Sequence, residues 1–96
     1  MRVALVTGGA RGIGAGISIK LKESGYKVAA IYAGNDKVAT KFSEENKIVI
    51  FKWSIANYEE CVAGIKRVEN ELGTIEILVN NAGITSDGMF HKMSPE

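Results

Sequence analysis

The stretch LVTGGARGIG, residues 5–14, changes character within a few positions. It starts as an apolar run typical of a buried strand and passes through a turn rich in glycine, Gly8–Gly12. From Ile13 the apolar residues recur four apart, as along one side of a helix. A strand that leads through glycines into a helix leaves unpaired N–H groups and partial positive charge at the turn, which favour phosphate.

The rest of the chain repeats this alternation of apolar strands and helices. Besides the helix that starts at Ile13 and ends at Ser24–Gly25, a helix is expected from a cap at Asn35 or Asp36 to about Glu45. A third is expected over residues 58–72. The predicted strands are residues 2–6, 27–32, 48–51 and 75–79. Alternating strands and helices indicate a parallel α/β sheet, and strands that are apolar on both sides indicate helices on both faces.

Composition excludes several classes of partner. The formal net charge of the 96 residues is +1, so nothing general favours nucleic acid or an anionic membrane. No apolar run approaches the roughly 18 residues of a membrane span. Cys61 is the single cysteine, which fits a reducing cytoplasm, and with His91 alone near the end no metal site is expected.

The glycine spacing separates three nucleotide-binding motifs. A P-loop requires lysine after its last glycine, and although Gly9 and Gly14 have the right separation, Ala15 follows them. The pattern G-x-G-x-x-G also fails, since Gly12 and Gly14 are followed by Ile17. The pattern present is T-G-x-x-x-G-x-G, at Thr7, Gly8, Gly12 and Gly14. A tight turn without any ligand is the alternative, and the surrounding β-α-β order makes it the weaker one.

TGGARGIG at 7–14 and NNAG at 80–83 resemble the paired signatures of the short-chain dehydrogenase/reductase family. The resemblance implies a Rossmann-type doubly wound sheet, of which residues 1–96 form the NADP-binding N-terminal part: four strands in the order 3-2-1-4, with helices on both faces. The first motif would hold the NADP(H) pyrophosphate, and the second would support the sheet beside the nicotinamide. Alternatively, Asn80–Asn81 is only a polar turn. The implied cofactor residues are Thr7, Gly8, Gly9, Ala10, Arg11, Gly12, Ile13, Gly14, Asn35, Ser54, Ile55, Asn80, Asn81, Ala82, Gly83 and Ile84.

The second strand favours NADP over NAD. An acid at its tip would bind the ribose 2′-OH of NAD, but residues 32–35 read YAGN. Asp36 is the first acid, and we interpret it as a helix cap. In ketoreductases of this family an arginine at the place of Arg11 faces the 2′-phosphate, although Arg11 could also be a solvated loop charge. The chain departs from the family at Ser54, where Asp or Asn usually bonds the adenine; Ser54 could simply end the strand, and Ile55 could still pack on the adenine.

The final stretch, NNAGITSDGMFHKMSPE, is similar to β-ketoacyl reductases of this family. The run FHKM at 90–93 favours the branch acting on acetoacetyl-CoA over the branch acting on acyl-carrier-protein thioesters. The implied reaction is hydride transfer from NADPH to a 3-oxoacyl thioester. Asp87 could border the acyl site, and an ordinary turn residue is at least as good an interpretation.

The family's catalytic residues are absent from these 96 residues. The family uses a Tyr with a Lys four positions later and an upstream Ser, whereas Tyr26, Tyr32 and Tyr58 are followed at that distance by Ala, Asp and Val. We therefore expect a fragment or truncated product of a reductase that as a complete protein forms homo-oligomers. The alternative from another class is a dinucleotide-binding module without chemistry.

Overall fold

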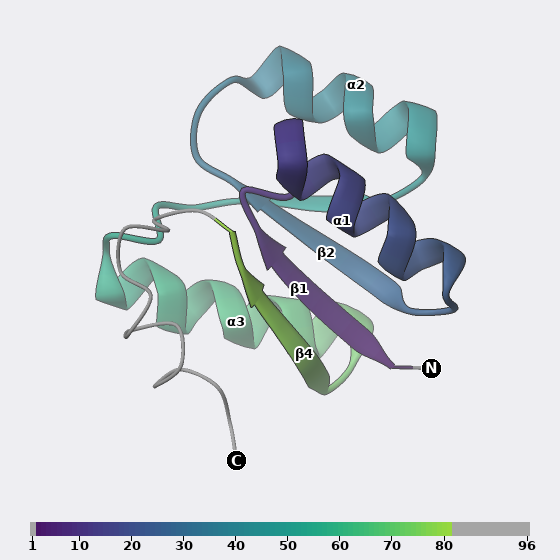
Figure 1. The fold of residues 1–96 in the computed structure, drawn as a ribbon. Helices are drawn as coiled ribbons and strands as arrows, with labels where there is room; N and C mark the ends of the chain where they lie inside the picture. Colours follow the sequence, from purple (N-terminus) through teal and green to yellow (C-terminus); the bar gives the residue numbers. More distant parts are fainter. Residues whose placement is uncertain (1, 82–96) are drawn as a thin grey trace.

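The computed structural model describes residues 2–81, and they form one parallel sheet with helices on both sides (Figure 1). Strands and helices alternate strictly along the chain, and the sheet order is β3-β2-β1-β4. The elements are β1 (Val3–Thr7), α1 (Gly12–Glu23), β2 (Lys27–Tyr32), α2 (Asp36–Asn46), β3 (Val49–Lys52), α3 (Tyr58–Leu72) and β4 (Ile75–Asn80). The predicted α/β fold, its strand order and its element order are confirmed.

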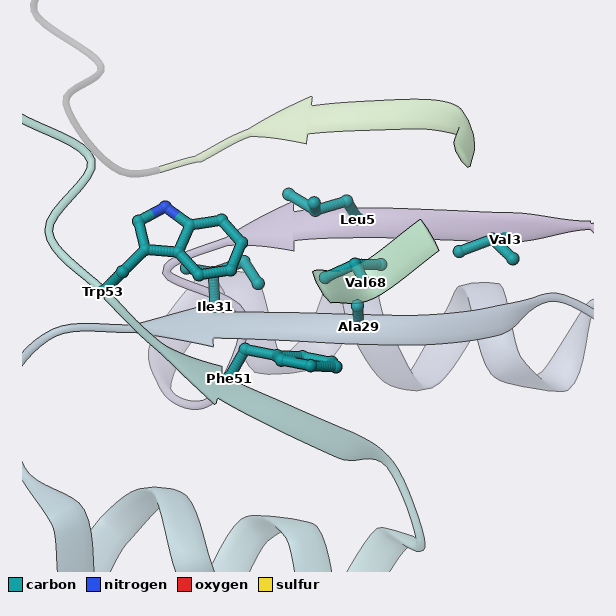
Figure 2. Close-up of a cluster of buried hydrophobic side chains, with 7 residues drawn as sticks. All are labelled: Val3, Leu5, Ala29, Ile31, Phe51, Trp53 and Val68. Carbon is teal, nitrogen blue, oxygen red and sulfur yellow. The ribbon is translucent and has the colours of Figure 1, made fainter. Parts of the chain in front are cut away.

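Each face of the sheet is covered by different helices. Helices α1 and α2 lie on one face, and α3 lies on the other (Figure 1). Figure 2 shows the buried cluster beneath α3, in which Val68 of the helix meets side chains from β1, β2 and the end of β3. Its buried members are Val3, Leu5, Ala29, Ile31, Phe51, Trp53 and Val68. The central strand β1 is buried along its whole length, as a strand between two neighbours and two helical layers must be.

The helix ends follow from local side-chain chemistry. The side chain of Asn35 accepts a hydrogen bond from the Val38 amide and caps α2, and Asn57 does the same for α3 through the Glu60 amide. Gly25 and Gly73 follow α1 and α3 with positive φ angles of 98° and 119°. The interpretation of Asp36 as a cap was wrong, because Asn35 is the cap and Asp36 is the first residue of the helix.

Several apolar residues of the helices and strands are exposed. Ile13 is 78% exposed, whereas the next residue of α1, Gly14, is buried against the glycine turn. The third strand starts at Val49, which is 42% exposed on the outer strand of the sheet. Val62 of α3 is 37% exposed, while Gly64 on the same helix is buried.

Candidate cofactor-binding site

The glycine turn is fixed to the neighbouring strand by its backbone. The amides of Gly8 and Gly9 both donate to the carbonyl oxygen of Ile31, at 2.8 and 3.3 Å. Gly8 and Gly12 have φ angles of 64° and 59°, a conformation that favours glycine. The turn therefore has a defined shape at the carboxyl end of β1, where ligands of open α/β sheets bind.

Two further glycines allow α1 to lie close against this turn. A Cβ atom on Gly14 would collide with the Gly8 carbonyl, and one on Gly9 would lie 2.7 Å from the hydroxyl of Ser18. Ser18 is fully buried in α1 and donates to the Gly9 carbonyl at 2.9 Å. Sequence reasoning missed Ser18, and its signal was a hydroxyl at the position four residues after Gly14, on the side of the helix that meets the turn.

The amino end of α1 offers hydrogen-bond donors to an anion. The first N–H groups of a helix have no partner within it. Arg11 precedes the helix without a side-chain cap bond, and the first turn holds no acidic residue. A Cβ on Gly12 would meet nothing within 4 Å, so this corner of the turn is open. These features suit a phosphate group.

Asn80 and Asn81 connect the end of β4 to the same turn. Thr7 and Asn80 are paired in the register of β1 and β4, and the Thr7 hydroxyl donates to the Asn80 side-chain oxygen at 3.0 Å. The side-chain amide of Asn81 donates to the Gly8 carbonyl at 3.4 Å. The structure thus brings together the described parts of two sequence motifs that are more than 70 residues apart.

A pocket of about 330 Å³ lies between the glycine turn and the tip of β2. The residues that line it are Gly8, Ala10, Arg11, Tyr32, Ala33, Gly34, Asn35, Val38 and Ala39. Arg11 is the one charged side chain in this lining, and no carboxylate contributes to it. The oxygen of the Asn35 side chain is engaged in capping α2, at 3.1 Å from the Val38 amide.

The carboxylate of Asp36 is held by side chains from the two adjacent strands, β2 and β3. Its Oδ1 atom accepts from the Tyr32 hydroxyl at 3.0 Å and lies 3.1 Å from the Lys52 ammonium group, which also donates to Oδ2 at 3.3 Å. The hydrogen bonds from Lys52 and Tyr32, with the charge of Lys52, hold the pKa of Asp36 below its ordinary value. The hydrogen bond to Asp36 raises the pKa of Lys52, while desolvation and then that same carboxylate raise the pKa of Tyr32. Asp36 is therefore ionised and paired at neutral pH.

The loop after β3 has its own internal bonds. The Ser54 amide donates to the Glu60 carboxylate at 2.8 Å, and the Ser54 hydroxyl accepts from the Ala56 amide at 3.3 Å. Ile55 is half-buried and packs against the cluster beneath α3. Ser54 thus shapes the loop through its backbone and hydroxyl, and its role toward an adenine stays a prediction.

Several predicted site residues lie outside the described part of the chain: Ala82, Gly83, Ile84 and Asp87, together with the run at 90–93. Within residues 2–81, no group of three or more His, Cys, Asp or Glu side chains could hold a metal ion. None of the helices in that range is long and apolar enough to cross a membrane.

The family model of the short chain dehydrogenases matches residues 2–96. The chain belongs to this family. Membership implies a nicotinamide dinucleotide cofactor, and the site fits one, because the open, glycine-lined amino end of α1 leaves room and donors for a pyrophosphate. Thr7, the glycine turn and Arg11 are the described residues that would hold it.

Curated relatives of the chain are reductases. The chain is 66% identical over 95 residues to an acetoacetyl-CoA reductase from Paracoccus denitrificans, covering 99% of this chain and 39% of that protein. It is 41% identical to a 3-oxoacyl-(acyl-carrier-protein) reductase from Staphylococcus aureus, covering 97% of this chain and 40% of the relative. The chain thus spans about two fifths of the length of these relatives.

The fold is also similar to solved members of the family. A candidate short-chain dehydrogenase/reductase from Sinorhizobium meliloti 1021 superposes with a TM-score of 0.79 at 34% identity. That match covers 85% of this chain and 40% of the solved chain.

Proposed function

We propose that residues 1–96 form the cofactor-binding part of an NADPH-dependent reductase that converts acetoacetyl-CoA to 3-hydroxybutyryl-CoA. One observation carries the proposal: the chain is 63–66% identical to three acetoacetyl-CoA reductases but 40–41% identical to the acyl-carrier-protein reductases it matches. The cofactor would supply the hydride that reduces the ketone. The cytoplasm, where Cys61 would stay reduced, is the proposed compartment.

In this proposal each described residue has a role in binding. The glycine turn and the amino end of α1 would receive the pyrophosphate, and the pocket lined by Arg11 would receive the adenosine ribose. Arg11 with no carboxylate beside it supports a 2′-phosphate, since guanidinium groups match phosphate in geometry and charge. The proton donor for the developing alkoxide would have to come from outside these 96 residues, because none of their tyrosines has a Lys four positions on.

The activity can be measured directly with the protein expressed from its complete gene. We expect NADPH oxidation that depends on acetoacetyl-CoA and is faster than with an acetoacetyl thioester of acyl-carrier protein. A polypeptide of residues 1–96 is the control, and it should leave NADPH unchanged. Equal or higher rates with the carrier-protein thioester would contradict the proposed substrate, and turnover by residues 1–96 would contradict the assignment of catalysis to residues elsewhere.

The cofactor preference can be tested at Arg11. In the same protein, Arg11→Ala should weaken binding of NADPH by about 1–3 kcal/mol and binding of NADH much less, because a charge-assisted bond to the 2′-phosphate is lost. Arg67→Ala removes the same charge from α3, on the other face of the sheet, and should change neither affinity. Calorimetric titration gives both constants, and equal losses for the two cofactors would show that Arg11 is only a loop charge.

A further inference from the structure

Asp36 stands one residue away from the pocket that Arg11 lines. Asn35, the residue before it, contributes to the pocket lining, whereas Asp36 does not. An acidic side chain at this place could accept a hydrogen bond from a ribose 2′-OH, and its charge would oppose a 2′-phosphate. The direction in which the Asp36 carboxylate is held therefore matters to the choice between the two cofactors.

The sheet register sets that direction. Tyr32 of β2 pairs with Lys52 of β3, so both side chains leave the sheet at the same level and on the same side. The Lys52 ammonium group lies 3.1 and 3.3 Å from the two carboxylate oxygens of Asp36, and the Tyr32 hydroxyl lies 3.0 Å from one of them. Together they occupy both oxygens of Asp36 and offset its charge.

We propose that Lys52 is a positioning residue for cofactor selectivity: it keeps the Asp36 carboxylate neutralised and outside the pocket, so that a 2′-phosphate is accepted there. Lys52 does not line the pocket, so it acts through Asp36 and not by touching the phosphate. The inference rests on the proposed use of NADPH. It adds a second determinant of cofactor selectivity to Arg11, on β3, a strand that contributes no residue to the pocket lining.

A double-mutant cycle in the protein expressed from its complete gene tests this. The probes are adenosine 2′,5′-bisphosphate and adenosine 5′-phosphate, titrated by calorimetry, so that the readout is binding and not turnover. Lys52→Met should weaken binding of the bisphosphate about fivefold, because the Asp36 carboxylate is then no longer neutralised. A factor of this size is expected when one exposed charge repels a phosphate across water. The same variant should leave adenosine 5′-phosphate unchanged or slightly tighter.

The decisive variant is Asp36→Asn combined with Lys52→Met. If Lys52 acts through Asp36, removing the carboxylate restores the affinity for the bisphosphate. Lys41→Met is the matched control, because it removes a lysine that is also paired with a carboxylate, Glu45, on α2, and it should change neither probe.

Four outcomes would overturn the inference in different ways. A loss that persists in the double variant would mean that Lys52 contacts the phosphate directly. Equal losses for both probes would mean that Lys52 only supports the fold. A wild-type protein that binds both probes equally would refute the proposed NADPH preference and this inference with it, whereas a wild-type preference that Lys52→Met leaves intact would refute the inference alone.

Discussion

At the scale of single residues, Asp36 is notable because one carboxylate connects three elements. It is the first residue of α2, it accepts from Tyr32 at the end of β2, and it pairs with Lys52 at the end of β3. Asp36 and Lys52 are exposed and Tyr32 is half-buried, so the energy of the ion pair is screened by water and salt. These contacts matter chiefly because they fix the positions of the charged groups at the edge of the sheet.

The pairing predicts how stability depends on pH. Because the pKa of Asp36 is lowered in the folded chain, the contribution of Asp36 is present above its ordinary pKa and is lost as the pH falls through the folded value. Lys52 has a raised pKa, so its share persists below its ordinary pKa and is lost in strong alkali. Urea unfolding of wild type and Asp36→Asn should show a stability difference near neutral pH that narrows as the pH falls below the ordinary aspartate pKa of about 3.9. A difference that does not vary as the pH falls would contradict the pairing.

At the scale of elements, the packing of α3 against the end of β3 depends on a glycine, which has no side chain. Gly64 is buried in the middle of α3, and a Cβ atom there would overlap the six-membered ring of Trp53. Trp53 is 7% exposed and belongs to the buried cluster beneath α3 (Figure 2). Glycine is a poor helix former, so its presence inside α3 is explained by this close approach.

A pair of glycine substitutions tests this packing. Gly64→Ala should destabilise the protein by about 1–3 kcal/mol, because the buried ring cannot move without disturbing the cluster. Gly16→Ala, at a position of α1 where a Cβ would meet nothing, should stabilise it by about 0.5–1 kcal/mol through helix propensity alone. Thermal unfolding of both variants gives the two signs, and a stabilised Gly64→Ala protein would contradict the contact with Trp53.

Element order and boundaries could be predicted from the sequence because local chemistry decides them. Asn57 caps α3, Gly73 ends it, and both signals stand in the sequence itself. Facts that depend on tertiary arrangement could not be predicted in this way. The exposure of Ile13 depends on which side of α1 meets the glycine turn, and the pairing of Lys52 with Asp36 depends on the register between β2 and β3.

In the candidate site, too, features set by local sequence could be predicted and features set by tertiary arrangement could not. The turn itself was predictable, because the glycines encode its backbone. Its attachment to Ile31, Ser18 and Asn81 was not, because those partners come from β2, from one side of α1 and from beyond β4. The resemblance to the family implies Thr7 and Asn80 as site residues, and the structure adds the hydrogen bond that joins them.

At the scale of the whole molecule, the two strands that flank the central strand β1, namely β2 and β4, differ in their surroundings. β2 has neighbours on both sides, whereas β4 pairs with β1 alone among the described strands. Every residue of β1 is buried, but no residue of β4 is fully buried, although four of its six residues are Ile, Leu or Val. An apolar strand with an open edge is a surface on which other chains pair.

A polypeptide of residues 1–96 should therefore associate with itself instead of remaining a compact monomer. Sedimentation at several concentrations should show average mass rising with concentration, because open β4 edges pair between copies. A single monomeric species with one cooperative thermal transition would contradict this expectation and would mean that the edge is covered. The protein expressed from its complete gene provides the comparison.

The central position of β1 also has a consequence in time. Val3 of β1 is synthesised before its partner on β4, Ile75, which follows 72 positions later (75 − 3). A ribosome that adds about 5–20 residues per second needs roughly 4–14 seconds for that interval. During those seconds β1 can pair with β2 but not yet with β4, so one edge of a strand that is buried along its whole length lacks its neighbour among the described strands. The nascent chain is thus exposed to misassembly for a period set by topology, and rapid delivery of β4 or a protecting chaperone would shorten or cover it.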